Sequence, residues 1–225
     1  MRLALALYAE GSTDDRFLTL IIQRTSRKIL AEYRKSNVSV VLVEPIKLFE
    51  KKPTREENIL QAARQAFRYQ ALIVHSDADT PLYEDAMKYR ILPGLDLVKQ
   101  SKSSVCGQLL PIIPIQAVEA WMLADFETLS AELRTDLKAH ELGIPEKTRQ
   151  IEKISKPKLR LNNAIAIVNK QLRPNQRIDV SSLYEPLGRK IRLERLQSLS
   201  AYQHFESDLT KVFAALTLMP EIQRM

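Results

Sequence analysis

The chain has 225 residues, of which 45% are hydrophobic and 27% are charged, a composition typical of soluble globular proteins. This length permits one large domain, or one domain with a smaller appendage. Cys106 is the only cysteine, which excludes a disulfide framework and zinc sites built on paired cysteines. No stretch approaches the ~20 apolar residues needed to cross a bilayer, so we expect a cytoplasmic protein with no membrane partner.

The net charge of +7 is unevenly distributed along the chain. Residues 1–150 contain 21 Lys and Arg against 20 Asp and Glu, whereas residues 151–225 contain 13 against 7. A polyanion would therefore be attracted to the last third of the chain. The competing interpretation is a basic surface that is merely solvated.

Strands and helices alternate in the first half of the chain. Apolar and β-branched runs predict strands, and apolar residues at helical spacing predict helices. In chain order, we expect a strand at residues 3–9, a helix that begins at Asp14, a strand at 38–43, a helix at 55–69, a strand at 71–76, a mainly helical stretch at 83–100 that is broken near Pro93 and Gly94, and a strand at 109–115. Pro111 and Pro114 favour an edge position for the last strand.

This alternation predicts a parallel sheet with helices on both faces. From residue 117 onwards the pattern is helical. We therefore expect an α/β fold, with a mainly parallel sheet flanked by helices in residues 1–125. A mostly helical, basic extension would occupy residues 126–225, and it could pack on the core as one unit.

Acidic residues follow three of the predicted strands. Glu10 follows the first strand, Asp77 and Asp79 follow the third. Glu119 follows the last apolar run. The carboxyl ends of parallel strands meet at one edge of a sheet, where open α/β sheets bind their ligands. Crowded carboxylates repel each other unless a cation or proton intervenes, and Mg²⁺ prefers oxygen ligands, so we expect Mg²⁺ or Mn²⁺ at this edge.

Other interpretations of these residues stay open. The D-x-D pair also occurs in haloacid-dehalogenase-type phosphatases, in glycosyltransferases and in simple turns. Asp14 is favoured as an acid or cap at the helix start, and Asp125 as a structural residue. His75 is favoured as a core residue, and Glu119 competes with an ordinary exposed helix position.

Two motifs together resemble a known family. "EGSTDDRFL" after the first strand and "DAD" after a later one resemble the TOPRIM domain of topoisomerases, primases and related nucleases. The resemblance implies that Glu10 is an acid or base in phosphoryl transfer and that Asp77 and Asp79 hold Mg²⁺. Thr80 and Pro81 stand where TOPRIM sequences often have another acidic residue.

Further stretches narrow the resemblance. "IPIQAVEAWMLAD", "KPK" and "YQHFESDL" look like an uncharacterised bacterial family related to TOPRIM domains. This likeness would give Glu119 a place in the site, and it associates the chain with phage defence.

Two classes of function follow from these patterns. The first is a Mg²⁺-dependent nuclease or related phosphoryl-transfer enzyme that acts on DNA or RNA. Its phosphate contacts would come from basic residues of the last third, namely Lys156, Lys158, Arg160, Arg189, Lys190 and Arg192. The second is a non-catalytic module that binds a metal, a nucleotide or nucleic acid and works with a partner, such as an ATPase or another defence protein. The chain has no Walker A motif of its own.

Overall fold

Strands and helices alternate through the first half of the chain, which confirms the predicted order. The computed structural model describes residues 2–9, 11–32, 38 and 40–222. The elements of this half are β1 (Arg2–Tyr8), α1 (Ser12–Glu32), β2 (Val40–Pro45), α2 (Arg55–Gln65), β3 (Ala71–His75), α3 (Tyr83–Ala86), a π-helical segment (Met87–Ile91), α4 (Leu92–Gln100) and β4 (Leu109–Ile112).

The four strands form one parallel sheet in the order β2-β1-β3-β4. Leu5 pairs with Val43 on one side and with Ala71 on the other, so β1 is central. β4 lies at an edge, where Pro111 pairs with Val74 and its missing N–H leaves no gap inside the sheet. All four strands run in the same direction, so their carboxyl ends share one edge.

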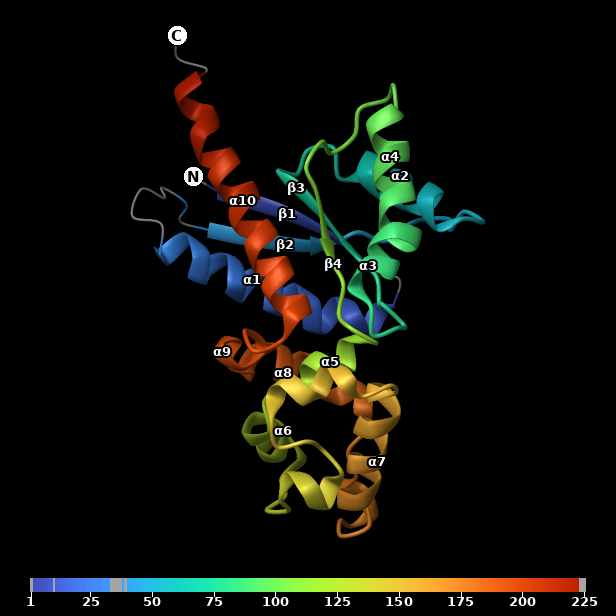
Figure 1. Cartoon of the computed structure of the whole chain (residues 1–225), viewed down its shortest axis with the longest axis vertical. Helices are drawn as coiled ribbons and strands as arrows, with labels where there is room; N and C mark the ends of the chain where they lie inside the picture. Colours follow the sequence, from blue (N-terminus) through green and yellow to red (C-terminus); the bar gives the residue numbers. More distant parts are fainter. Residues whose placement is uncertain (1, 10, 33–37, 39, 223–225) are drawn as a thin grey trace.

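Helices cover both faces of this sheet (Figure 1). The alternation of side chains along β1 explains why: Leu3, Leu5 and Leu7 join one apolar cluster, whereas Ala6 and Tyr8 join another. Helices α1 and α10 (Ser200–Ile222) pack on the first side, and α2 and α4 pack on the second. The predicted α/β architecture is therefore the observed one.

The stretch from residue 83 to 100 differs in detail from its prediction. It is helical throughout, and its irregularity lies at the π-helical segment that precedes Pro93, not at Pro93 and Gly94 themselves. Pro93 occupies the first turn of α4, where a missing N–H is tolerated. The chain therefore accommodates the proline by a local change of helix type.

The second half of the chain is helical. Its α-helices are α5 (Val118–Met122), α6 (Phe126–Leu133), α7 (Pro157–Asn169), α8 (Tyr184–Lys190), α9 (Leu193–Leu196) and α10. Short 3-10 helices lie at Ala139–Leu142, Thr148–Lys153, Pro174–Gln176 and Val180–Ser182. In Figure 1, α5 to α9 gather below α1, and α10 returns across the sheet.

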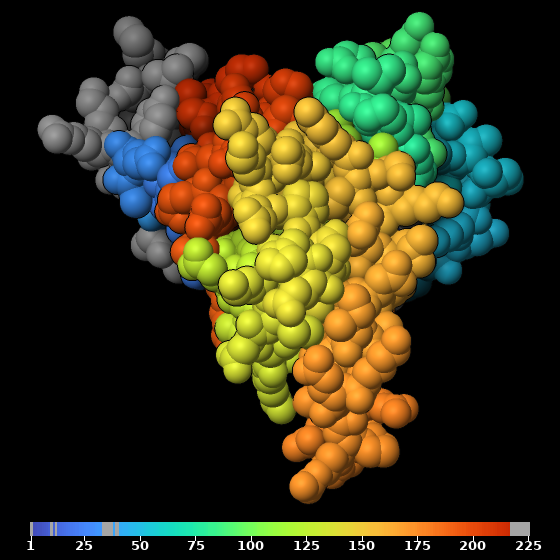
Figure 2. All heavy atoms as spheres, turned by 60° about the horizontal axis from the view of Figure 1, so that its bottom comes forward, coloured from blue at the N-terminus to red at the C-terminus, as the bar shows by residue number. Residues whose placement is uncertain are grey.

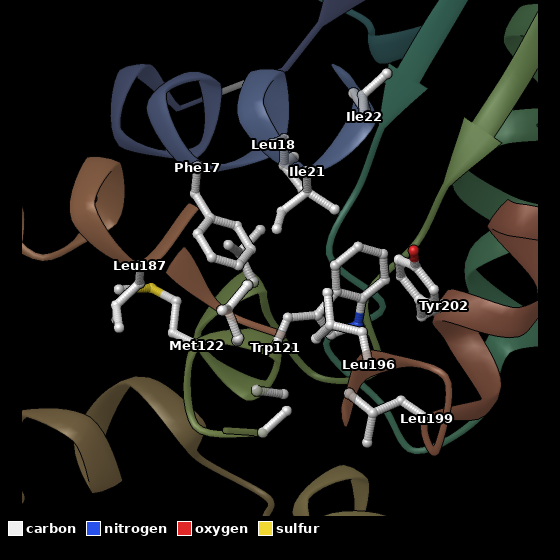
Figure 3. Packing of buried hydrophobic residues seen from close by; sticks show 14 of the residues in the cluster. Phe17, Leu18, Ile21, Ile22, Trp121, Met122, Leu187, Leu196, Leu199 and Tyr202 are labelled. Atoms are coloured by element: carbon white, nitrogen blue, oxygen red, sulfur yellow. The ribbon is translucent and has the colours of Figure 1, made fainter. Parts of the chain in front are cut away.

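One apolar cluster joins the two halves of the chain. Trp121 of α5 packs edge-on against Tyr202 of α10, with ring centroids 5.5 Å apart. In Figure 3, Phe17 of α1 lies beside Leu187 of α8, and all of these side chains belong to the same buried cluster. The helical half is thus packed on the sheet layer through α1.

Within the described part of the chain, no helix is both long enough and apolar enough to span a membrane.

Candidate acidic site at the carboxyl edge of the sheet

Asp77 is the best-positioned acid of this edge. It lies two residues beyond β3, and its Oδ1 accepts hydrogen bonds from the backbone N–H of Val118 at 3.0 Å and from Nε2 of His75 at 3.2 Å. Val118 begins α5, and a helix N-terminus favours a negative charge. These contacts fix the orientation of the carboxylate, and its side chain keeps 31% exposure to solvent.

Asp79 points to a different partner. Its φ angle is 54°, in the left-handed region, so the chain does not stay extended between the two aspartates. The Asp79 carboxylate forms an ion pair with Arg90 at 2.6 Å, and Arg90 also donates to the backbone carbonyl of Asp77 at 3.2 Å. An extended D-x-D would present both acids on the same side; here the turn at Asp79 brings its carboxylate to a cation of the π-helical segment.

Glu119 is a buried acid rather than an exposed helix residue. Only 4% of its surface is accessible, and its Oε1 accepts a hydrogen bond from the phenol of Tyr184 at 2.6 Å. Burial raises the pKa of Tyr184, and the hydrogen bond to Glu119 raises this pKa further, so the phenol stays protonated as a donor. Tyr184 comes from α8, which explains why no local pattern pointed to this pairing.

Asp14 is a third acid near Asp77 and Glu119, and it lies at a helix start, as the sequence favoured. It lies in the first turn of α1, where burial raises its pKa to about 6; the nearby carboxylates of Asp77 and Glu119 raise it as well, and His75 opposes them. A Cβ atom placed on Gly11 would overlap the Asp14 carboxylate, so glycine at this position leaves room for the acid. We call Asp14, Asp77 and Glu119 the acidic cluster.

The implied metal site is only partly accounted for by these residues. Glu10 lies outside the described residues, so its place relative to Asp77 is not part of the structure. Among the residues that are described, no group of three His, Cys, Asp or Glu side chains is arranged to hold a metal ion. Asp79 is paired with Arg90, and Glu119 accepts from Tyr184. The described carboxylates therefore do not form a metal centre as they stand.

The six basic residues singled out in the sequence fall into two groups. Lys156, Lys158 and Arg160 are exposed around the start of α7, and none of the three has an ion-pair partner within the described ranges. Figure 2 shows the orange segment at the end of α7 protruding from the surface, and Arg173 and Arg177 beyond it are exposed too. These cations are available to a polyanion.

The second group is engaged with acids of the chain itself. Arg189 pairs with Glu185 and Lys190 pairs with Glu132, each at 2.7 Å. Arg192 binds Asp125 at 2.5 Å and Glu127 at 2.8 Å. A phosphate would have to compete with these carboxylates.

Asp125 has the structural role that the sequence favoured. It is fully buried, it caps α6 by accepting from the backbone and hydroxyl of Thr128, and it accepts three hydrogen bonds from Arg192. Burial alone would raise its pKa, but the bonds from Arg192 and Thr128 outweigh burial and hold the pKa at about 2.

His75 was missed as a neighbour of the acids. It is buried, as the sequence favoured, yet its Nε2 contacts Asp77, while its Nδ1 has no hydrogen-bond partner among the residues that the structure describes. Residues i and i+2 of an extended chain share a side, and that spacing was the signal available in "HSD".

No protein-family model, no curated protein and no solved structure matches this chain.

Proposed function

We propose that the chain is a metal-dependent hydrolase of phosphodiester bonds in nucleic acid. One observation carries this proposal: Asp14, Asp77 and Glu119 converge at the carboxyl edge of a parallel sheet, and the pKa of Asp14 is raised to about 6. This edge is where open α/β sheets bind ligands, and carboxyl groups with perturbed pKa values concentrate at functional sites.

The residues of the cluster suggest separate roles. A carboxyl group with a pKa of about 6 exchanges its proton near neutral pH, which suits Asp14 to general acid or base chemistry. Asp77 is held in place by Val118, and the phenol of Tyr184 keeps Glu119 oriented. The TOPRIM resemblance implies that Glu10 also serves as an acid or base.

A bound metal ion would need ligands in addition to those of the acidic cluster. Mg²⁺ or Mn²⁺ would need Glu10, or an Asp79 released from Arg90, in addition to Asp77. The TOPRIM resemblance supports this ion and suggests a role in phage defence. If Arg90 restrains Asp79, then Arg90→Gln should strengthen the stabilisation of the protein by Mg²⁺ in thermal melts, because a ligand that binds the native state raises its stability.

The test of the proposed function is a cleavage assay with Asp77→Asn. The amide keeps an oxygen that can accept from Val118, so we expect an intact fold and loss of Mg²⁺- or Mn²⁺-dependent cleavage of single- and double-stranded DNA and RNA. Asp96→Asn is the matched control, because Asp96 is an exposed aspartate on α4 that pairs only with Lys99 among the described residues. Equal cleavage by wild type and Asp77→Asn would overturn the assignment.

A non-catalytic module is the second candidate, and the ion pair between Arg90 and Asp79 favours it. This pair leaves the described acids without a three-ligand metal group. Such a module would bind metal, nucleotide or nucleic acid and would work with a partner protein, such as an ATPase. Binding of nucleic acid without cleavage under any metal condition would select this candidate.

A further inference from the structure

An exposed aromatic side chain stands at the tip of the loop after β2. Phe49 is 99% exposed, so both faces of its ring are accessible to a ligand. The loop "IKLFEKKPT" carries three lysines, Lys47, Lys51 and Lys52, and one acidic residue, Glu50, which pairs with Lys52 at 3.0 Å. We call residues 46–54 the Phe49 loop.

Hydrogen bonds hold both ends of the Phe49 loop, so the fold fixes the position of its tip. At its start, Ile46 is buried and its N–H donates to the carbonyl of Leu7 at 2.7 Å. At its end, the buried side chain of Asn58 accepts from the N–H of Lys52 and donates to the carbonyls of Lys52 and Thr54, at 2.7 to 2.9 Å.

The loop lies on the same edge of the sheet as the acidic cluster. It leaves the carboxyl end of β2, and β2 is parallel to β1 and β3. Lys47 forms an ion pair with Asp15, the residue after Asp14, so the loop is tied to the helix start that carries the cluster.

A pocket of about 260 Å³ lies beside the start of the loop, where Pro45 forms part of its wall. Its wall combines Pro45 at the end of β2 with Arg16 of α1 and Arg189 of α8. Asp15 and Glu185 line it as well, and they pair with Lys47 and Arg189, so the pocket carries charges of both signs.

We propose that the Phe49 loop is a stacking platform that delivers a single-stranded nucleic acid to the acidic cluster. Single strands expose the faces of their bases, and proteins bind them with aromatic rings for stacking and with cations that follow the backbone. Phe49 supplies the ring, and Lys51 and Lys52 supply phosphate contacts. The pair of Lys52 with Glu50 is exposed and therefore weak, so a phosphate can replace it. This proposal rests on the proposed function only in taking nucleic acid as the ligand.

The surroundings of Phe49 favour this occupant over an apolar protein surface or a duplex. The loop carries lysines rather than further exposed large apolar residues, since Leu48 is half-buried and packs on the core. A double helix hides the faces of its bases within the stack, so it offers this ring nothing to stack on.

The test measures binding by fluorescence anisotropy in EDTA, where cleavage is suppressed. Labelled single strands of DNA and RNA are compared with the corresponding duplexes. We expect Phe49→Leu to weaken binding of single strands by roughly fivefold to a hundredfold, the range for loss of one stacked base, and Phe49→Trp to retain it. Neutralising Lys51 and Lys52 to Gln should flatten the salt dependence by about 0.7 per lost phosphate contact.

Phe67→Leu is the matched control. Phe67 is also an exposed aromatic with a cation beside it, since Arg68 lies 5.1 Å from its ring centroid. It precedes β3, however, so it lies at the amino edge of the sheet, away from the acidic cluster. We expect this variant to bind like the wild type.

The outcomes separate the platform from the proposed function. Loss of binding in Phe49→Leu without any cleavage by the wild type would uphold the platform and reject the hydrolase. Cleavage by the wild type with unchanged binding in Phe49→Leu would do the reverse. Equal effects of Phe49→Leu and Phe67→Leu, a preference for duplex, or no binding of any nucleic acid would each overturn the platform.

Discussion

The carboxyl group of Asp14 makes the stability of the protein depend on pH. Its pKa rises from 3.8 to about 6 on folding, so the native state binds more protons than the unfolded state between these values. The free energy of unfolding therefore falls as the pH rises from about 4 to 6, and the full penalty is present above pH 6.

Asp14→Asn should remove this penalty. We expect the variant to be more stable than the wild type by about 1–2 kcal/mol at pH 7.5, a value reduced for the partial exposure of the group, and to show no gain near pH 4. Urea melts at the two pH values check the prediction. A gain of the same size at both would mean that the effect is not the titration of Asp14.

For single residues, the sequence predicted where the acids lie in the fold better than it predicted which residues they contact. It located Asp77 and Glu119 at the carboxyl edge, because parallel strands bring their ends together. It could not predict the bond from Tyr184 to Glu119, which spans 65 residues, or the turn at Asp79. It placed Asp14 at the helix start, where the structure has it, but could not predict its burial, because the packing that buries this acid comes from elements distant in the chain.

Helices α1 and α8 approach each other closely at Gly188. A Cβ atom at this position would lie 3.0 Å from the carbonyl oxygen of Phe17 and 3.1 Å from Leu20 Cδ1. Arg24 of α1 binds the carbonyls of Gly188 and Ile191 at the end of α8, at 3.0 and 2.6 Å. The two helices are therefore fixed in register, with Tyr184 held towards Glu119.

Gly188→Ala should push α8 away from α1. Overpacking of this kind costs about 1–3 kcal/mol of stability, and denaturant melts should show that loss. The shift of α8 should also weaken the hydrogen bond from Tyr184 to Glu119. Gly107→Ala is the control, because a Cβ at Gly107 meets nothing within 4 Å. Identical stabilities for the two variants would show that α1 and α8 accommodate the added methyl group without strain.

The pair of Asp125 and Arg192 joins α6 to the segment before α9. The pKa of Asp125 is lowered to about 2, so the pair stabilises the native state above about pH 4 and loses this effect as the pH falls towards 2. Asp125→Ala leaves Arg192 without its buried partner and should cost about 3 kcal/mol at pH 7 in urea melts, less at pH 3.

Glu127→Gln is the matched control for this pair. Glu127 binds the same guanidinium, but its side chain is 66% exposed, and exposed ion pairs contribute about 0–1 kcal/mol. A loss in Glu127→Gln as large as that in Asp125→Ala would contradict the importance of burial.

The elements themselves were largely predictable from local patterns. The alternation of leucines in β1 and the β-branched run of β2 predicted the strands to within a few residues. The π-helical segment before Pro93 was not predictable, since the spacing of apolar residues does not distinguish a widened helical turn from a regular one. The edge position of β4 followed from Pro111, whose missing N–H is tolerated there.

If the proposed function holds, two basic surfaces of the described residues would contact the nucleic acid: the Phe49 loop and the start of α7. Replacing Lys156, Lys158 and Arg160 together by Gln should weaken binding of nucleic acid and flatten its dependence on salt, by about one unit of slope per lost contact to duplex phosphates. Titrations of affinity against salt check this result. Unchanged affinity and slope would assign the α7 surface to solvent or to a protein partner.

The route of α10 has a consequence for how the protein is made. Tyr202 of α10 bonds Thr25 of α1 at 2.8 Å, and Glu206 bonds Lys28 at 3.0 Å, across 177 and 178 residues of chain. During synthesis, the surfaces of α1 and of the sheet that α10 covers in the folded protein therefore stay uncovered until the ribosome has released the residues near 202. Contacts of such long range slow folding and prolong the exposure of apolar surface, so we expect the chain to be most prone to aggregation before α10 docks.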